Sequence, residues 1–166
     1  MPMILPTVLP VDFKQSQHTD ALWRMMNLYA IDPMGGGVAL PDTQHAAFLR
    51  QMADWQTQRA AVILLAWCDQ QPVGLLNAFE GFSTFAARRL LNIHDVIVHP
   101  NHRGQGIAGL LLAAAETIAQ QRGYCKMTLE VLQGNQSAQA LYRKVGFAGY
   151  TLDPAQGQAL FWQKFL

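Results

Sequence analysis

The stretch that decides the fold is IHDVIVHPNHRGQGIA, residues 93–108. Its apolar first half predicts a strand over residues 90–98, and the helical spacing of apolar residues beyond it predicts a long helix over residues 107–121. Between them lies the turn Arg103-Gly104-Gln105-Gly106. Its glycines let successive backbone N–H groups point inward, and the helix adds its own free N–H groups and the positive end of its dipole. The junction is therefore suited to binding a pyrophosphate.

The same turn also matches the dinucleotide-binding motif G-x-G-x-x-G, at Gly104, Gly106 and Gly109. Glu130 follows at the distance where such a fold places its ribose ligand. Two features disfavour this interpretation. Residues 99–103 separate the strand from the glycines, and the sequence beyond the helix does not continue as a βαβ series. A purely structural glycine turn is the remaining alternative.

Short apolar or alternating runs, helical periodicity and turn residues divide the rest of the chain. The order indicates an α/β fold with a mixed sheet and helices on its faces. Residues 32–37, with the sequence DPMGGG, are expected to form a flexible loop. Strands are predicted at residues 7–13, 60–67, 73–80, 90–98, 126–132, 147–152 and 159–165, and helices at residues 20–29, 42–55, 107–121 and 135–144.

Composition restricts the class of protein. The chain has 166 residues, 51% of them hydrophobic, which suits one domain with a substantial core. A net charge of +1 argues against nucleic acid as a partner, because such proteins present a basic face. The apolar run of residues 60–68 is too short to span a membrane, and the N-terminus has prolines and no basic segment typical of a signal peptide. With only two cysteines, Cys68 and Cys125, we expect a cytoplasmic protein.

Two blocks of the sequence resemble the GCN5-related N-acetyltransferase (GNAT) family. The first is the acetyl-CoA signature R/Q-x-x-G-x-G/A after a strand that ends in Val, filled by Arg103, Gly106 and Ala108. The second is N-x-x-A-x-x-L-Y-x-x-x-G-F, and every position of it is matched. The resemblance covers residues 72–150 and in layout is nearest to polyamine and diamine acetyltransferases. The matching residues of the second block are Asn135, Ala138, Leu141, Tyr142, Gly146 and Phe147.

The resemblance implies the acyl-CoA N-acyltransferase fold, a single domain over residues 1–166 with a mixed, mostly antiparallel sheet of six to seven strands and about four helices. Residues 1–60 would form the acceptor side, residues 72–150 the acetyl-CoA core and residues 151–166 closing strands that pair chains as a homodimer. The implied activity is direct acetyl transfer from acetyl-CoA to a small-molecule amine in a ternary complex. A protein lysine or N-terminal acetyltransferase and a non-catalytic acyl-CoA-binding module are the alternatives.

The resemblance also implies the cofactor site. The strands at residues 90–98 and 126–132 are expected to splay apart, so that the pantetheine arm pairs with the first of them and a backbone N–H there donates to the oxyanion. Tyr142 takes the place of the family's general acid. The expected acetyl-CoA contacts are Ile97, Val98, Arg103, Gly104, Gln105, Gly106, Ile107, Ala108, Gly109, Asn135, Ala138 and Tyr142.

A base must remove the proton of the amine, and His94 and Asp95 are the candidates. His94 stands where polyamine acetyltransferases have Glu. Strand alternation places His94 and Asp95 on opposite faces, so that Asp95 acts only through its field. A hydrogen-bonded core histidine is an equally weighted alternative for His94. No carboxylate or thiol completes a metal site with the histidines, and contacts with a cationic amine are expected from Asp32, Glu80 and Asp95, beside the loop of residues 32–37.

Overall fold

Two long strands form the centre of the sheet in the computed structural model, which describes residues 6–151, 153, 155, 157 and 159–166. Strand β2 (Ala61–Cys68) is buried along nearly its whole length, as its apolar sequence predicts, and β3 (Gln71–Ser83) runs back beside it. Asp69 and Gln70 join them with φ angles of +48° and +62°. Two successive positive φ angles are typical of a type I′ turn, whose twist matches that of the strands.

The sheet has five strands in the order β1-β2-β3-β4-β5 among the described residues. Strand β1 (Thr7–Pro10) and β4 (Arg88–Val98) lie on either side of the central pair, and all three of these neighbouring pairings are antiparallel. Only β5 (Met127–Leu129) runs parallel to its neighbour, β4. The mostly antiparallel sheet is thus confirmed. The dinucleotide interpretation is wrong, because that fold needs a parallel sheet built from βαβ units.

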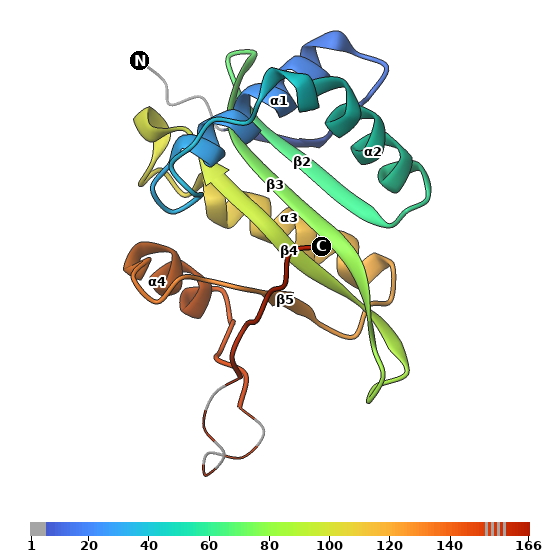
Figure 1. The fold of residues 1–166 in the computed structure, drawn as a ribbon, viewed down its shortest axis with the longest axis vertical. Helices are drawn as coiled ribbons and strands as arrows, with labels where there is room; N and C mark the ends of the chain where they lie inside the picture. The colour runs from blue at the N-terminus through green and yellow to red at the C-terminus, as the bar shows by residue number, and fades with distance from the viewer. Residues whose placement is uncertain (1–5, 152, 154, 156, 158) are drawn as a thin grey trace. The chain divides into compact units, whose positions relative to one another are not determined.

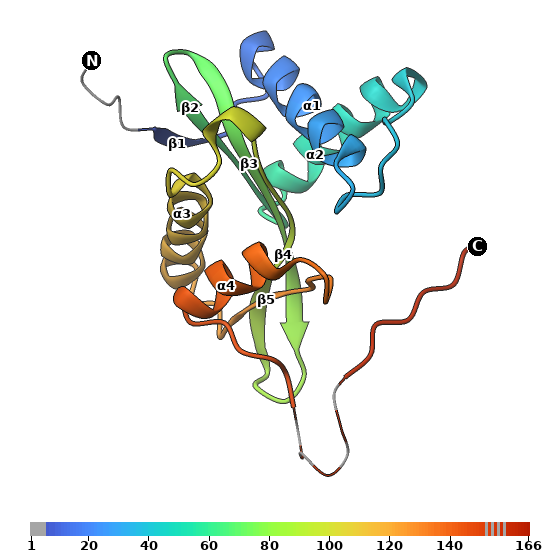
Figure 2. The same cartoon turned by 90° about the vertical axis from the view of Figure 1, so that its left-hand side faces the viewer.

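Helices cover both faces of this sheet (Figures 1 and 2). The helices α1 (Ser16–Ile31) and α2 (His45–Thr57), the second preceded by the short 3₁₀ turn η1 (Asp42–Gln44), lie on one face. Helix α3 (Ile107–Gln121) lies on the other face and packs on β2, β3 and β4. The core on the α1 and α2 face comprises buried apolar side chains from five elements, among them Leu22, Met25, Ile63, Leu65, Leu75 and Ile97.

The pairing of β3 with β4 slips by one residue near the middle. Ile93 pairs with Ala78, but the next pair is Asp95 with Asn77, so His94 has no cross-strand partner. An extra residue of this kind is a β-bulge, and it changes which side chains of β4 share a face.

The described residues divide into two compact units, and the second begins at Gln133. Its helix α4 (Gln136–Lys144) is capped by Asn135, whose Oδ1 accepts the N–H of Ala138 at 3.1 Å. The helix gives way to Gly146 with φ of +96°, the conformation that glycine adopts most readily after a helix.

The two predicted closing strands are wrong where the structure describes them. Residues 147–151 and 159–166 form no strand, and residue 152 lies outside the described residues. An alternating sequence indicates which residues would form an apolar face. A strand also needs a neighbouring strand to pair with its N–H and C=O groups, and the described part of the second unit contains no strand. The sheet therefore has five strands rather than six to seven. None of the helices in the described residues has the length and apolarity that a membrane crossing requires.

Candidate active site

The glycine turn after β4 has the open backbone that anion binding needs. The 3₁₀ turn η2 (Pro100–His102) leads through Arg103 to Gly104 and Gly106, whose φ angles are +75° and +81°. Gly106 begins α3 without a side-chain cap, and a Cβ atom built on either glycine would meet no atom of the structure within 4 Å. The first backbone N–H groups of a helix have no acceptor within it. The turn that is predicted to bind a pyrophosphate therefore has the positive φ angles that glycine allows.

Arg103 reaches away from this turn toward the end of α1. Its Nε donates to the Val98 carbonyl oxygen at 3.2 Å, and one terminal nitrogen lies 2.8 Å from Oδ2 of Asp32. That bond and the N–H of Met34 lower the pKa of Asp32, with the Met34 bond as the larger cause. The phosphate loop and the predicted acceptor loop are thus joined by an ion pair.

Strands β4 and β5 are paired over only three residues. The register joins residues 91–93 to residues 127–129, and Asn92 adds a side-chain bond to Oγ1 of Thr128 at 3.0 Å. Beyond Ile93, residues 95–98 of β4 pair with β3 alone among the described strands. One edge of β4 is therefore without a paired strand at residues 95–98 among the described residues, and contact of Ile97 and Val98 with a pantetheine arm stays a prediction.

His94 and Asp95 lie on the same face of β4, and the prediction that they face opposite ways is wrong. The nearest atoms are His94 Nδ1 and Asp95 Oδ1, 3.6 Å apart. The physical reason is the bulge at His94, because an extra residue breaks the alternation on which the prediction relied. Asp95 can therefore act on His94 by contact as well as through its field.

The imidazole of His94 is accessible, with its side chain 62% exposed, whereas the Asp95 side chain is only 14% exposed. Interaction with Asp95 raises the pKa of His94, partial burial opposes this, and the charge of Glu130 raises it further. An exposed imidazole beside a shielded carboxylate is a suitable proton acceptor. The alternative of a simple core histidine does not fit this exposure.

Asn77 and Tyr29 complete the surroundings of Asp95. Asn77 is 1% exposed, and its Nδ2 donates to Asp95 Oδ2 at 2.9 Å. Burial raises the pKa of Tyr29, and the charges of Asp95 and Asp32 raise it further. The Tyr29 phenol is therefore within the electrostatic influence of both Asp95 and Asp32.

An aromatic wall adjoins His94. The ring of Phe79 lies edge-on to His94, with centroids 5.6 Å apart, and Trp55 of α2 is 5.3 Å from Phe79 in the same manner. Aromatic faces attract cations, and together with nearby carboxylates they suit an ammonium ligand. Neither residue was predicted from the sequence.

Glu80 does not join the other two expected acceptor contacts. Its Oε2 accepts from the Tyr124 hydroxyl at 2.6 Å and from Arg89 at 3.2 Å. Glu80 pairs with Leu91 of β4. Side chains alternate along β3 and Glu80 is three residues from Asn77, so the two point to opposite faces, and Glu80 lies on the face that α3 covers. Glu80 therefore lies on the other face of the sheet from Asp95 and is not an acceptor contact.

The loop of residues 32–37 is held by hydrogen bonds in the structure, and its flexibility stays a prediction. The backbone oxygen of Asp32 accepts from Gly35 and Gly37 at 2.8 and 3.1 Å, and its Oδ1 accepts from Met34 at 2.9 Å. A Cβ atom on Gly35 would lie 2.0 Å from the Tyr29 carbonyl oxygen. The loop folds closely against the end of α1, and only glycine fits at that position.

The remaining predicted site residues belong to α4 and its N-cap. Tyr142 stands in the last turns of α4, with its ring centroid 5.9 Å from that of Phe147. Asn135 and Ala138 form the helix cap, which gives this part of the family motif a local structural role beside any contact with acetyl-CoA. The catalytic role of Tyr142 stays a prediction.

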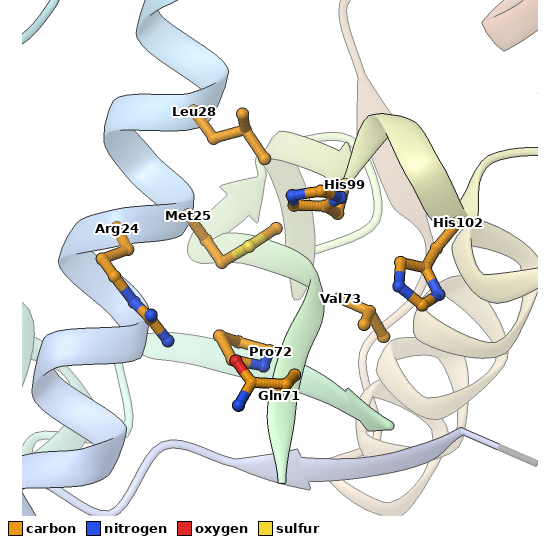
Figure 3. A pocket seen from close by; sticks show the side chains of 8 residues that line it. All are labelled: Arg24, Met25, Leu28, Gln71, Pro72, Val73, His99 and His102. Carbon is orange, nitrogen blue, oxygen red and sulfur yellow. The ribbon is translucent and has the colours of Figure 1, made fainter. Parts of the chain in front are cut away.

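A separate pocket of about 390 Å³ opens between α1, the start of β3 and η2 (Figure 3). Arg24, His99 and His102 lie on its wall, and Met25, Leu28 and Val73 form its apolar part. None of the predicted catalytic or cofactor residues lines it. Within the described residues, no three or more His, Cys, Asp or Glu side chains gather as a metal ion would need.

Sequence reasoning missed Asn77, although a signal was present. An amide inside the otherwise apolar run VGLLNAF (residues 73–79) is costly to bury unless it has a polar partner. Tyr29 falls at one of the apolar positions of the helical spacing in residues 20–29, and that spacing alone does not distinguish a core tyrosine from one influenced by two carboxylates.

The profile of the Acetyltransferase (GNAT) family matches residues 22–147, and the chain belongs to this family. Streptothricin acetyltransferase of Streptomyces lavendulae is 41% identical over 88 residues, which cover 52% of this chain and 47% of that protein. Aminoglycoside N(6')-acetyltransferase type 1 of Acinetobacter haemolyticus is 28% identical over 61% of this chain and 72% of its own length. The aligned region thus spans about half of the first relative.

Solved structures share the fold. AAC(6')-Iy, in complex with the bisubstrate analog CoA-S-monomethyl-acetylneamine, superposes with a TM-score of 0.74 over 98% of this chain and 99% of its own, at 15% sequence identity. At that identity the likeness establishes the arrangement of helices and strands and nothing more.

Proposed function

We propose that this protein is an acetyl-CoA-dependent N-acetyltransferase that acetylates the amine of a small cationic molecule. The observation that carries the proposal is the position of His94 and Asp95. They share one face of β4 where it parts from β5, on the strand that leads into the open phosphate loop. Acyl transfer needs a proton acceptor, a held thioester and donors for the oxyanion, and this strand offers all three.

In the proposed reaction the amine attacks the thioester carbon directly within a ternary complex. His94 takes the ammonium proton, with Asp95 stabilising the imidazolium that results. A backbone N–H near Ile97 and Val98 donates to the oxyanion. A C–N bond forms, the C–S bond breaks, and Tyr142 gives its proton to the departing thiolate. The second proton, which the new amide nitrogen releases, returns the Tyr142 phenolate to the phenol. A phenol of pKa about 10 can protonate a thiolate whose conjugate acid has a pKa of about 8.5.

The proposed acetyl-CoA site is the turn Arg103-Gly104-Gln105-Gly106 with the first residues of α3, Ile107, Ala108 and Gly109. The open space above Gly104 and Gly106 fits a pyrophosphate, since any side chain there would occupy it. The family resemblance also implies Asn135 and Ala138 as acetyl-CoA contacts, and we propose that role for them.

The proposed acceptor is small and cationic. Asp95 and Glu130 place negative charge near His94, and Phe79 with Trp55 supplies an aromatic wall. The names of the relatives point the same way, because streptothricin and aminoglycosides are the substrates that those names state. We further propose a cytoplasmic homodimer without nucleic acid or membrane as partner.

The test is a two-armed assay of thiol release from acetyl-CoA. One arm offers small amines, including polyamines, diamines and aminoglycosides, and the other offers lysine-containing and N-terminal peptides. The proposal predicts turnover in the first arm and product carrying acetyl on nitrogen. Turnover in the peptide arm alone would favour a protein acetyltransferase, and acetyl-CoA binding without turnover in either arm would indicate a non-catalytic binding module.

A further inference from the structure

Asp32 and Arg103 each stand at the C-terminal end of a helical element. Asp32 is the C-cap of α1 and Arg103 is the C-cap of η2, and their side chains meet at 2.8 Å although 71 residues separate them in the sequence. The Arg103 side chain is 50% exposed, but that of Asp32 is only 17% exposed. A charge pair with one shielded partner is screened less by water than a fully exposed pair.

The carboxylate of Asp32 serves two loops at once. Its Oδ1 accepts from the backbone N–H of Met34, which shapes the loop of residues 32–37, and its Oδ2 accepts from Arg103. Arg103 in turn donates its Nε to the Val98 carbonyl oxygen at the end of β4. One side-chain pair therefore connects the acceptor-side loop, the end of β4 and the start of the phosphate loop.

This geometry bears on what Arg103 does. A guanidinium whose Nε and one terminal nitrogen are already engaged, the latter by a carboxylate, offers little net charge to an approaching pyrophosphate. The same two bonds fix the residue from which the phosphate loop departs, since Gly104 and Gly106 follow directly with positive φ angles. Glycines at such angles gain the freedom to adopt other conformations, so an anchored residue before them restricts the turn.

From these contacts we infer that Asp32 is a positioning residue that acts through Arg103 to hold the phosphate loop in its acetyl-CoA-binding conformation, and that the pair couples the cofactor loop to the acceptor loop. This rests on the proposed binding of acetyl-CoA at that loop. It assigns Asp32 a different role from a direct contact with the amine, and Arg103 a different role from a direct phosphate ligand.

Calorimetry of acetyl-CoA binding in the absence of amine, with a double-mutant cycle, distinguishes these roles. Asp32→Asn keeps an oxygen for Met34 and replaces the oxygen that accepts from Arg103 by an NH2 group, so it removes both the charge and the bond to Arg103. We expect Asp32→Asn and Arg103→Gln each to weaken acetyl-CoA affinity by roughly 5- to 10-fold, the effect of losing one charge-assisted hydrogen bond. The double variant should bind no more weakly than the weaker single variant, because both changes break the same connection.

Two further variants sharpen the cycle. Arg103→Lys can keep a single bond to Asp32, so it should bind acetyl-CoA more tightly than Arg103→Gln when Asp32 is present. In the Asp32→Asn background the Lys and Gln variants should bind acetyl-CoA equally. Glu80→Gln is the matched control, because it breaks the Arg89 ion pair at 3.2 Å, remote from the phosphate loop in the fold, and should leave acetyl-CoA affinity unchanged. Thermal unfolding of each variant verifies that it is folded.

Several results would overturn the inference. If Asp32→Asn leaves acetyl-CoA affinity unchanged or tightens it while Arg103→Gln weakens it, Arg103 is a direct phosphate ligand that Asp32 partly neutralises. If the two losses add in the double variant, the residues act independently. An effect of Asp32→Asn on the KM of the amine alone would make Asp32 an acceptor contact. A wild-type protein that fails to bind acetyl-CoA would overturn the proposed function as well, which separates that failure from the others.

Discussion

Asn77 of β3 donates its Nδ2 to Asp95 Oδ2 of β4 at 2.9 Å, directly beside the slip in register that leaves His94 without a cross-strand partner. The amide is almost fully buried, and the carboxylate that it holds lies 3.6 Å from the imidazole. The bulge and this bond together turn His94 and Asp95 to one face. The candidate base is therefore positioned by a buried side chain on the neighbouring strand.

Replacing Asn77 by Leu should impair catalysis without impairing acetyl-CoA binding. Leu keeps most of the volume but removes the donor, which leaves Asp95 free to turn away from His94. We expect kcat/KM for the amine to fall by roughly 10- to 100-fold, at or below the low end of the ~10²- to 10⁴-fold contribution of a general base, because His94 itself is kept. Ser83→Ala, at the far end of β3, is the control and should retain normal kcat/KM. An Asn77→Leu variant with normal kcat/KM would show that the bond does not position the base.

The pH profile tests His94. Because Asp95 and Glu130 raise its pKa above the ordinary 6.5, the imidazole keeps its proton to higher pH, and the neutral, proton-accepting form appears only as the pH passes that raised value. We expect kcat/KM to rise with pH through an inflection above 6.5. Asp95→Asn should move the inflection downward, and His94→Ala should remove it and lower the rate, with partial recovery at high pH. An unchanged limb in His94→Ala would assign the base elsewhere.

Loss of the Tyr142 hydroxyl should affect the chemical step alone. Tyr142→Phe keeps the ring that contacts Phe147 and removes the proton proposed for the leaving thiolate. We predict a fall in kcat on the order of 10²-fold, as is typical for a general acid, with acetyl-CoA affinity nearly unchanged. A normal kcat at saturating concentrations of both substrates would remove Tyr142 from the mechanism.

A side chain at Gly106 should weaken the binding of acetyl-CoA more than it disturbs the packing of the protein. A Cβ atom there meets no neighbour, but the φ of +81° is strained for alanine by about 1 kcal/mol, and the methyl group would project from the cradle. We expect Gly106→Ala to weaken acetyl-CoA binding by at least 10-fold in calorimetry. Gly123→Ala is the matched control, since φ there is +71° with equally open space at the end of α3. Equal affinities in the two variants would show that the loop does not bind the phosphates.

Features that depend on local sequence were predictable. The apolar run of residues 60–67 became β2, the helical spacing of residues 107–121 became α3, and the glycine turn before α3 has the positive φ angles that its composition implied. Each of these follows from periodicity or from the freedom of glycine, which neighbours in sequence determine.

Features that depend on pairing were not predictable. The alternation rule assumes regular pairing, so it could not locate the bulge at His94. It therefore placed His94 and Asp95 on opposite faces of the strand. It also predicted closing strands at residues 147–152 and 159–165, because an alternating segment does not reveal whether a neighbouring strand is available. Likewise, the Asp32 and Arg103 contact joins segments whose proximity only the folded chain reveals.

The central claim is acetyl transfer to a small amine, and the most direct measurement compares kcat/KM for thiol release from acetyl-CoA between the best small cationic amine and the best lysine peptide. Mass spectrometry should identify the N-acetylated amine as the product. We predict a kcat/KM for the small amine at least 10-fold above that for any peptide. The activity toward the small amine should be lost in Tyr142→Phe and in His94→Ala. Thiol release that no small amine stimulates above the protein-free rate would contradict it.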